Sequence, residues 1–410
     1  MKIGVDIRVL MDKNYSGVSR YLADLLTALF KIEKEKNSPK NNYFLFYNSF
    51  KDQKNRLSVW ENDFSQIRCL AWPNKIFNYL AQRVFRFPKL DILLNKPDVF
   101  WLPHFNFSAF SRNSKTKKVI TVHDLSFLRY PEFFSWRKNF WHKALGIKKM
   151  LQEAQVIIAV SENTKYDLID ILKIKAEKIK VIHSGFSPLE ANLFNSFDKK
   201  DRELFFKKHK LEAFLEKGFI LYLGNIEPRK NLVNLIKAYE LWRRKIAKDD
   251  LVLPLVLAGA KGWKTRAIFS AWQKSNFKND IFFLSYVNDA ERELLYSKTK
   301  LFIYPSFYEG FGLPPLEAMA RSLPVITSNI SSLPEVVADS ALMIDPNDPL
   351  EMSEAITLVL EDENLRQELI KRGLKRVESF SWEKTALEYL KVFSELNTEF
   401  EKNNNLNNEE

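Results

Sequence analysis

The stretch LFIYPSFYEGFGLPPLEAMA, residues 301–320, shows the clearest structural pattern in the chain. Its apolar run at 301–304 is typical of a buried strand, and its paired prolines favour the first turn of a helix, where a missing N–H costs nothing. Two glycines between strand and helix allow the backbone to approach a ligand closely. Short apolar runs alternate with helical patterns along the whole chain, so the sequence predicts an α/β protein with parallel sheets.

Two carboxylates flank this glycine loop, Glu309 before it and Glu317 about one turn inside the helix. A helix N-terminus offers free N–H groups and a partial positive charge, which suit an anionic group. Carboxylates would repel a diphosphate, so we expect them to accept hydrogen bonds from neutral hydroxyls, as in a nucleotide sugar. Two alternatives stay open: ordinary surface glutamates, or the acid/base pair of a glycoside hydrolase, whose separation the spacing cannot give.

The charge of the chain is unevenly placed. Residues 1–187 hold 32 Lys and Arg against 17 Asp and Glu, a net +15, whereas the remaining residues hold 31 against 34, a net −3. This asymmetry predicts an anionic partner for the first half: a membrane surface, nucleic acid or a phosphate-bearing substrate. Because no recognised nucleic-acid motif or basic tail accompanies it, we expect no nucleic-acid partner.

Several classes of protein are disfavoured. A single cysteine, Cys69, rules out an internal disulfide and fits a reducing compartment, and no His or Cys cluster has metal-ligand spacing. Dinucleotide, P-loop and serine-hydrolase motifs are absent, so we expect neither cofactor nor metal. The N-terminus predicts a strand rather than a signal peptide, and no apolar run approaches the roughly 18–20 residues that span a bilayer. We therefore expect a cytoplasmic protein, with peripheral contact at the inner face of a membrane as an open alternative.

The order of elements predicts two doubly wound, Rossmann-like domains. They are expected at 1–187 and 217–380, joined by a charged linker at 188–216; a C-terminal helix, 381–398, would pack back on the first domain, and 399–410 would be disordered. A cleft between two such domains is a natural place to shield a donor from water. The expected strands are Lys2–Val9, Tyr43–Tyr47, Val99–Leu102, Val119–Val122, Val156–Val160, Ile179–Ile182, Phe219–Leu223, Leu251–Leu257, Ile281–Leu284, Leu301–Tyr304, Pro324–Thr327 and Leu342–Ile344.

Three further segments place reactive side chains at strand ends. In LYLGNIEPRKN, residues 221–231, the cations Arg229 and Lys230 stand between strand and helix and can hold a diphosphate. His123 ends the strand in VITVHDL and can donate to a sugar hydroxyl or transfer a proton. Gly17 precedes a helix and would bring N–H groups to the phosphates. Solvated surface charges and a buried, satisfied histidine are the alternatives.

Together these segments resemble the retaining glycosyltransferases of family four, which have the GT-B fold, two Rossmann-like domains facing across a cleft. The resemblance covers Lys2 to about Phe393. It implies that Glu309 contacts the transferred sugar and that Arg229 and Lys230 clamp the diphosphate. It also places His123 near the reacting sugar, Glu317 at the ribose and Val287 near the base. The donor-binding set is then Gly17, Val287, Gly310, Phe311, Gly312, Leu313 and Glu317.

The segments HDLSFL and GNIEPRKN look most like the mannosyltransferase-type members that build bacterial surface polysaccharides. The resemblance implies transfer of a hexose, with mannose favoured, from a nucleotide-diphosphate sugar to a saccharide or lipid-linked saccharide, with retention and without a metal. The chain departs from the family at Asn225, where an arginine is frequent, at Ser285, where many members have glycine, and at Ser16-Gly17, which replaces a glycine pair.

Two readings outside hexosyl transfer stay open. A GT-B enzyme of another class, an epimerase or phosphorylase, could use the same cleft, and a non-catalytic protein could bind anionic surfaces. Segments 75–87 and 133–150 mix aromatic residues with Arg and Lys, as helices at a membrane interface do. Either these segments dock on anionic lipid, or their aromatic residues belong to the core.

Overall fold

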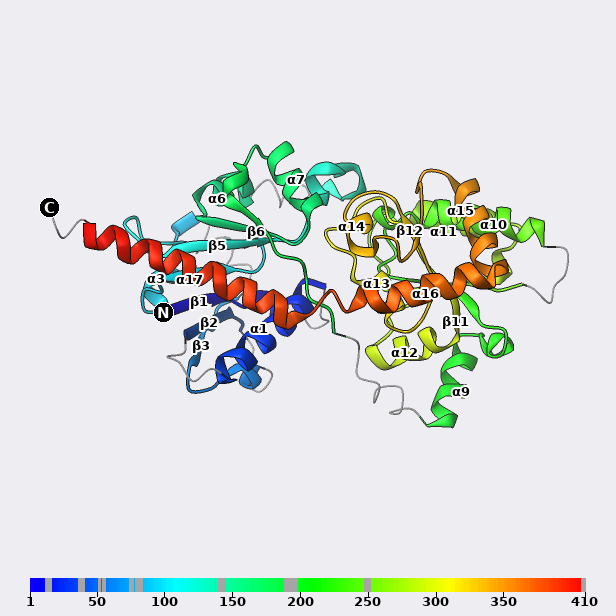
Figure 1. Cartoon of the computed structure of the whole chain (residues 1–410), viewed down its shortest axis with the longest axis horizontal. Helices are drawn as coiled ribbons and strands as arrows, with labels where there is room; N and C mark the ends of the chain where they lie inside the picture. Colours follow the sequence, from blue (N-terminus) through cyan, green and yellow to red (C-terminus); the bar gives the residue numbers. More distant parts are fainter. Residues whose placement is uncertain are drawn as a thin grey trace. The chain divides into compact units, whose positions relative to one another are not determined.

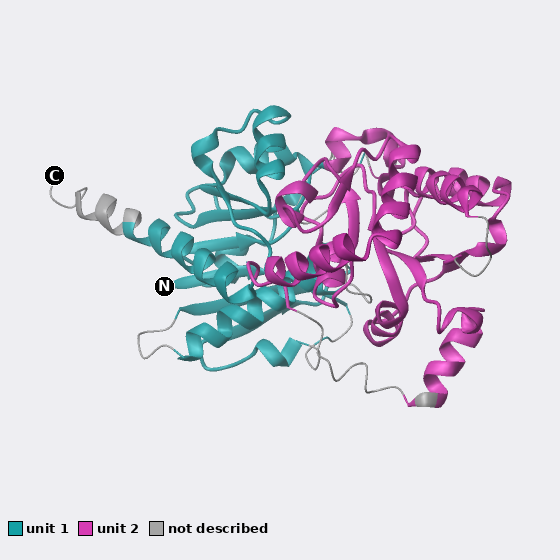
Figure 2. Ribbon diagram, turned by 45° about the vertical axis from the view of Figure 1, so that its right-hand side comes forward, with its two compact units in different colours: residues 1–125, 140–185, 381–410 teal, residues 126–139, 186–380 magenta. Residues whose placement is uncertain are grey.

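The computed structural model describes residues 1–11, 17–35, 41–50, 53, 57–73, 77, 84–136, 138, 140, 145–187, 198–246 and 252–406. These residues fall into two compact units, coloured separately in Figure 2. Unit 1 comprises Met1–Leu125, Phe140–Gly185 and Ser381–Glu410, and unit 2 comprises Ser126–Asn139 and Phe186–Phe380. Each unit is built on one parallel sheet, as the alternation of apolar runs and helices predicts.

Unit 1 holds a seven-stranded parallel sheet in the order β3-β2-β1-β4-β5-β6-β7. The order of strands reverses between β1 and β4, which marks this sheet as doubly wound. The strands are β1 (Lys2–Asp6), β2 (Asn42–Asn48), β3 (Ser65–Leu70), β4 (Val99–Leu102), β5 (Lys117–Val122), β6 (Val156–Ala159) and β7 (Ile179–Val181).

Two details of this sheet differ from the sequence-based expectation. Strand β1 ends at Asp6 rather than Val9, because Arg8 turns back to bond Asp6, with 2.9 Å from Arg8 Nε to Asp6 Oδ1. Strand β3 was not expected at all. It lies at the sheet edge, and its sequence SQIRCL leaves several side chains exposed, so it lacks the apolar run that identified the other strands.

The helices of unit 1 cover its sheet, as Figure 1 shows for α1, α6 and α17. Helix α1 turns one apolar face inward, burying Tyr21, Leu22, Leu25 and Leu29. The described helices are η1 (Arg8–Met11), α1 (Gly17–Glu35), η2 (Ser58–Trp60), α3 (Leu90–Leu93), α6 (Ile147–Glu153), α7 (Glu162–Asp170), η5 (Ala176–Lys178) and α17 (Trp382–Leu406).

The C-terminal helix α17 is a core element of unit 1. The Tyr389 hydroxyl lies 2.7 Å from the Tyr21 hydroxyl and 2.7 Å from Thr121 Oγ1, and Trp101 Nε1 donates to the same Thr121 atom at 2.9 Å. The Tyr389 ring also packs against Trp101 and Phe393. The helix continues to Leu406, past its expected end at residue 398, and 407–410 lie outside the described residues.

Unit 2 holds a six-stranded parallel sheet in the order β10-β9-β8-β11-β12-β13, which reverses between β8 and β11. Helices cover both faces: α10 packs with α15, and α13 with α16 (Figure 1). The strands are β8 (Phe219–Leu223), β9 (Leu255–Ala258), β10 (Ile281–Leu284), β11 (Thr299–Tyr304), β12 (Val325–Ser328) and β13 (Leu342–Ile344). The helices are α4 (Ser126–Arg129), η4 (Pro131–Phe133), α9 (Lys199–Lys208), η6 (Glu212–Phe214), η7 (Pro228–Lys230), α10 (Leu232–Lys245), α11 (Arg266–Lys274), η9 (Lys278–Asp280), α12 (Asp289–Lys298), α13 (Leu313–Met319), α14 (Leu333–Val337), α15 (Pro349–Glu361) and α16 (Glu363–Val377).

Residues 126–139 belong to unit 2, although the sequence placed them in the first domain. Aromatic packing explains the difference: Phe133 stacks on Phe307 with ring centroids 5.8 Å apart, and Phe134 stacks on Trp263 at 5.6 Å. Trp263 Nε1 also donates to the Phe133 carbonyl at 2.6 Å. The expected linker is corrected too, since residues 198–216 form α9 and η6 within unit 2, and 188–197 lie outside the described residues.

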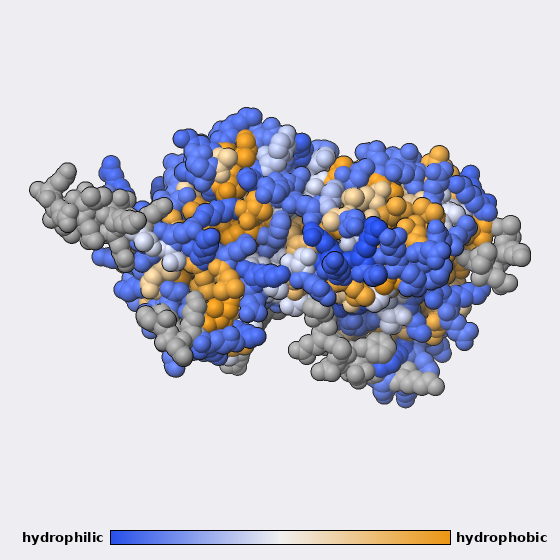
Figure 3. Space-filling model, in the orientation of Figure 1, coloured by the Kyte–Doolittle hydropathy of each residue, from blue (hydrophilic) through white to orange (hydrophobic). Residues whose placement is uncertain are grey.

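Apolar side chains reach the surface of both units in small patches among polar ones (orange in Figure 3). Within the residues that the structure describes, no helix combines the length and the apolar character needed to cross a membrane.

Candidate functional site

The loops after β8 and β11 lie where the strand order of unit 2 reverses. In a doubly wound sheet, this position opens a crevice at the carboxyl ends of the strands. The loop after β8 leads into η7, which carries Arg229 and Lys230, and the loop after β11 carries Glu309. Segments some eighty residues apart in sequence therefore meet at one sheet edge, as the sequence predicted for these three residues.

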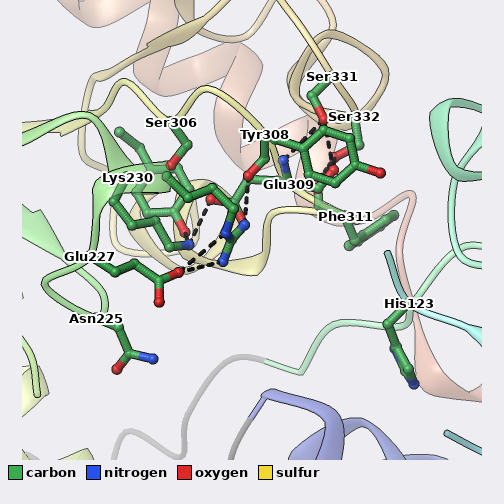
Figure 4. A network of polar contacts seen from close by, with 12 residues as sticks. His123, Asn225, Glu227, Lys230, Ser306, Tyr308, Glu309, Phe311, Ser331 and Ser332 are labelled. Atoms are coloured by element: carbon green, nitrogen blue, oxygen red, sulfur yellow. Dashed lines mark hydrogen bonds and ion pairs between the residues drawn. The ribbon is translucent and has the colours of Figure 1, made fainter. Parts of the chain in front are cut away.

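Glu309 is held by both cations (Figure 4). Its Oε1 accepts a hydrogen bond from Lys230 Nζ at 2.6 Å, and its Oε2 accepts one from Arg229 Nη1 at 2.9 Å. Lys230 Nζ also donates to the Tyr304 hydroxyl at 2.5 Å. Glu309 and Lys230 are 7 % and 6 % exposed, so these ion pairs are largely removed from water.

Burial and charge act against each other in this cluster. Burial alone would raise the pKa of the Glu309 carboxyl, but the charges of Arg229 and Lys230 lower it to about 2. Burial and the charge of Arg229 lower the pKa of Lys230. The carboxylate is therefore ionised at neutral pH despite being buried, because its partners compensate for the lost water.

The Glu309 loop is fixed by hydrogen bonds from two sides. The Phe307 N–H donates to the Arg229 carbonyl at 2.9 Å, and Arg229 Nη1 donates to the Tyr308 carbonyl at 2.5 Å. From the other side, the Ser331 hydroxyl donates to the Glu309 carbonyl at 2.8 Å and accepts from the Glu309 N–H at 3.0 Å. These bonds fix the backbone of the loop that carries Glu309.

Gly312 ends the loop in a conformation that suits only glycine. Its φ is 109°, and a Cβ there would lie 2.8 Å from Leu333 Cδ2. Helix α13 begins at the next residue, with the paired prolines in its first turn as expected. The expected donor-binding residues Gly310, Phe311, Gly312 and Leu313 therefore form the end of the Glu309 loop and the start of α13.

Glu227 belongs to the same cluster, and the sequence analysis missed it. Its Oε1 accepts from Arg229 Nη2 at 2.9 Å and from Arg229 Nε at 3.2 Å, and it is 1 % exposed. Two carboxylates and two cations thus meet, and their formal charges cancel. Glu227 stands in the EPRKN segment, two residues before Arg229. This spacing alone does not indicate that the two side chains form an ion pair.

Glu317 lies in a second cluster of unit 2. Its carboxylate accepts from Arg292 Nη1 at 3.2 Å on Oε1 and 3.1 Å on Oε2, and from the Tyr296 hydroxyl at 3.1 Å on Oε2. Both partners stand on α12, so the two glutamates of the 301–320 stretch have separate sets of partners. Val287 is half-buried in the loop that leads from β10 to this helix.

His123 follows β5 in unit 1 and is neutral. Its Nε2 lies 2.8 Å from the Pro103 carbonyl, which can only accept, so Nε2 carries the proton. Burial, followed by the charge of His104, lowers the pKa of His123 to about 4. The Tyr21 ring packs edge-on against it at 4.7 Å. Nδ1 is consequently an acceptor at neutral pH, rather than the donor to a sugar hydroxyl that the sequence suggested.

The candidate residues divide between the two units. Unit 1 holds His123 and Gly17, the exposed first residue of α1, while unit 2 holds the others. Ser16 lies outside the described residues, and Asn225 and Ser285 are both exposed in unit 2. Among the residues with a described placement, no group of three or more His, Cys, Asp or Glu side chains could hold a metal ion.

Two family descriptions match the chain: "Glycosyltransferase Family 4" over residues 51–188 and "Glycosyl transferases group 1" over residues 203–376. O-antigen chain mannosyltransferase B of Escherichia coli is 32% identical over 304 residues, which cover 74% of each chain. The serotype-specific mannosyltransferase WbdA of the same species is 31% identical over 286 residues, 69% of this chain. The chain spans about a third of the length of WbdA, 34%.

Solved structures share the fold at low identity. Sucrose-phosphate synthase from Thermosynechococcus elongatus has a TM-score of 0.70 at 20% identity, covering 97% of this chain and 99% of that one. The Anabaena protein Alr3699/HepE, solved with UDP-glucose, has a TM-score of 0.66 at 16% identity, covering 96% and 100%.

Two doubly wound parallel sheets, matched along their length by these structures, define a glycosyltransferase of the GT-B fold. Both ion-pair clusters of unit 2 lie within the matched group 1 region. The chain belongs to glycosyltransferase family four, as its motifs indicated.

Proposed function

We propose that the protein is a retaining hexosyltransferase that moves mannose from a nucleotide-diphosphate sugar to a saccharide or lipid-linked saccharide. The observation that carries the proposal is the pair of ion pairs that Arg229 and Lys230 form with buried Glu309, where the strand order of the unit 2 sheet reverses. Mannose and polysaccharide synthesis are supported by the names of relatives, which include O-antigen mannosyltransferases and a capsular polysaccharide glycosyltransferase.

The proposed chemistry follows from charge. As the bond between sugar and phosphate breaks, negative charge grows on the leaving diphosphate, and cations aimed at it lower the barrier. Arg229 and Lys230 supply this charge. Because Glu227 and Glu309 neutralise them in the structure, donor binding must turn part of their N–H groups toward the phosphates. An oxygen of Glu309 then becomes available to accept a hydrogen bond from a sugar hydroxyl. Such a charge-assisted hydrogen bond contributes about 1.5–3 kcal/mol.

His123 completes the proposal from unit 1. Its neutral ring, with the proton on Nε2, offers Nδ1 as an acceptor for a hydroxyl of the sugar or acceptor. With a pKa of about 4, it keeps this role across the neutral range. Gly17, at the first turn of α1, is assigned to the phosphates through its backbone N–H.

The donor is tested first by thermal shift with GDP-mannose, UDP-glucose, UDP-N-acetylglucosamine and dTDP-rhamnose. The donor that stabilises the protein is then incubated with and without saccharide acceptors, and the product linkage is determined by NMR. We expect release of nucleoside diphosphate only with an acceptor, and an anomeric configuration equal to that of the donor. Turnover of donor without acceptor would point to an epimerase, and an inverted product would reject retention.

We also propose that the basic N-terminal half of the chain, residues 1–187, contacts an anionic membrane surface. In segment 133–150, Phe134 and Ile147 are buried, whereas Trp136 and Phe140 are 74 % and 65 % exposed. Most of segment 75–87 lies outside the described residues, but Phe85 is 71 % exposed. Co-sedimentation with vesicles tests the contact: binding to anionic but not zwitterionic vesicles is expected, and no binding at low salt rejects it.

A further inference from the structure

The Glu317 carboxylate has little capacity left for a ligand. A carboxylate has about four lone-pair positions, two on each oxygen. Arg292 Nη1 uses one on each oxygen, at 3.2 Å and 3.1 Å, and the Tyr296 hydroxyl uses the second on Oε2 at 3.1 Å. With all contacts to described residues counted, one position remains, on Oε1. The side chain keeps about a tenth of its surface, 11 %, through which a ligand could reach it.

The contacts of Arg292 direct its guanidinium at Glu317 although they leave one of its own N–H groups without an acceptor in the described part of the chain. Its Nη2 donates to Asp289 at 2.8 Å, which ties it to the start of α12. Its Nε is buried and has no acceptor among the described residues, so this placement leaves one donor unsatisfied. Burial would lower the pKa of Arg292, but the charge of Glu317 raises it above its usual value. The guanidinium is thus fully charged and directed at the carboxylate.

The backbone of Glu317 is fixed as well. Arg321, in the turn that follows α13, donates through Nη1 to the Glu317 carbonyl at 2.6 Å and pairs with Glu293 of α12. The backbone from which the side chain extends is thereby fixed, while the orientation of the carboxylate is set by Arg292 and Tyr296. Pulling it away from Arg292 would leave a buried guanidinium with Asp289 as its remaining ion-pair partner among the described residues.

We infer that Arg292 is a positioning residue that restricts Glu317 to a single ribose hydroxyl of the donor. The inference rests on the proposed function and on the contact between Glu317 and the ribose that the family resemblance implies, and it defines a class of substrates. Nucleotide sugars that lack the other ribose hydroxyl, including one deoxyribose form, remain donors. An unobstructed carboxylate, with both oxygens available, would instead bind the 2′- and 3′-hydroxyls together and penalise loss of either.

The test uses three probes with the full chain: the nucleoside 5′-diphosphate whose base stabilises the protein, its 2′-deoxy form and its 3′-deoxy form. Calorimetric titration measures each affinity. We expect one deoxy form to bind within about twofold of the parent and the other to bind at least about tenfold more weakly, the effect of one charge-assisted hydrogen bond. A loss of about tenfold or more for both deoxy forms would overturn the inference.

Variants separate positioning from folding. In Arg292→Ala, Glu317 regains acceptor positions, so the ratio between the two deoxy affinities should fall to within about threefold. Arg292→Lys, which keeps the charge but not the planar fork, should lower the ratio in the same direction. Arg244→Ala is the matched control, because Arg244 is an exposed arginine of α10 that pairs with Glu240, and its ratio should equal that of the wild type.

The outcomes distinguish the inference from the proposed function. If Glu317→Ala weakens the parent but both Arg292 variants keep the wild-type ratio, Arg292 is merely structural and the inference fails alone. If Glu317→Ala changes none of the three affinities, the assignment of Glu317 to the ribose fails, and the inference fails with it. A lower melting temperature in Arg292→Ala with an unchanged ratio also counts against positioning.

Discussion

The carboxyl edges of the two sheets share a topology but not a chemistry. In unit 2, two carboxylates and two cations are buried together, and the pKa of Glu309 is lowered to about 2. In unit 1, the edge presents neutral His123, held by a carbonyl and packed against a tyrosine ring. A charged edge suits an anion whose charge grows during reaction, and a neutral edge suits hydroxyls. The fold supplies the edges, and the side chains decide what each one binds.

The largest effect should come from removing charge at the unit 2 edge. Glu309→Gln keeps the shape of the side chain but removes the charge that would accept the sugar hydroxyl. One charge-assisted bond corresponds to about 1.5–3 kcal/mol, so we expect kcat for sugar transfer to fall roughly 10- to 150-fold. His123→Gln, which removes a neutral bond, should cost only about 2- to 13-fold.

Glu354→Gln is the matched control, because this glutamate is exposed on α15. It should leave the rate unchanged, and circular dichroism should show that all three variants are folded. Equal losses for Glu309→Gln and His123→Gln would break the contrast between the edges, and a fully active Glu309→Gln would remove Glu309 from the mechanism.

The ion cluster should also respond strongly in stability. Lys230→Met leaves a buried carboxylate with one partner fewer, so the free energy of unfolding should fall by about 3–5 kcal/mol. The double variant with Glu309→Gln should lose less than the sum of the single losses, since the charge that Lys230 served is gone. Urea unfolding of the four proteins measures this coupling. Additive losses would mean that the two side chains act independently.

Acid should affect the two edges in separate windows. The pKa of His123 is about 4 in the folded protein and near 6.5 when unfolded, so its contribution is complete above pH 6.5 and falls as pH drops toward 4. The pKa of Glu309 falls from 4.5 to about 2 on folding, so its contribution is lost between these values. His123→Gln should flatten the first window only, in urea titrations at pH 7.5, 5.5 and 4.5. An unchanged slope between pH 7.5 and 5.5 would contradict this.

A smaller loss is expected away from both edges, in the core of unit 1. Tyr389→Phe removes the hydroxyl that bonds Tyr21 and Thr121 and leaves those groups buried with fewer partners. We expect a loss of about 1–3 kcal/mol in the free energy of unfolding. Tyr166→Phe, exposed on α7, is the control and should change little. Transfer activity at low temperature should persist in Tyr389→Phe, because the change does not reach unit 2.

The smallest effect should follow removal of divalent metal. Protein cations neutralise the diphosphate in the proposed mechanism, so transfer in EDTA should match transfer without it. Recovery of a lost activity by added Mg²⁺ or Mn²⁺ would show that Arg229 and Lys230 do not suffice.

The residues of the site that could be predicted from the sequence are those that directly follow a strand. Glu309, Arg229 and Lys230 each follow a strand directly, and parallel strands of one sheet end at one edge, so their meeting could be inferred. Most strands were found the same way, from apolar runs. Strand β3 was missed because an edge strand can be polar on both faces.

Partners brought together by folding left no such signal. Glu227 is an ordinary loop residue, and Arg292 and Tyr296 are ordinary helix residues. Only the packed structure shows that Glu227 pairs with Arg229 and that Arg292 and Tyr296 bind Glu317. Segment 126–139 joined the other unit through stacked rings, which sequence periodicity cannot assign to one core or another. The protonation of His123 likewise depends on a carbonyl twenty residues away.

Unit 1 combines residues 1–125 and 140–185 with residues 381–410. During synthesis, unit 1 therefore cannot be complete until unit 2 has been made. A ribosome adds about 5–20 residues per second, so the stretch 186–380 takes roughly 10–40 seconds to make. Throughout that interval Trp101 and Tyr21 lack the helix that covers them, since Tyr389 and Phe393 have not been synthesised. Unit 2 can complete its own sheet first. Until α17 has been synthesised, unit 1 exposes the aromatic surface that this helix covers. Such a surface can bind a chaperone.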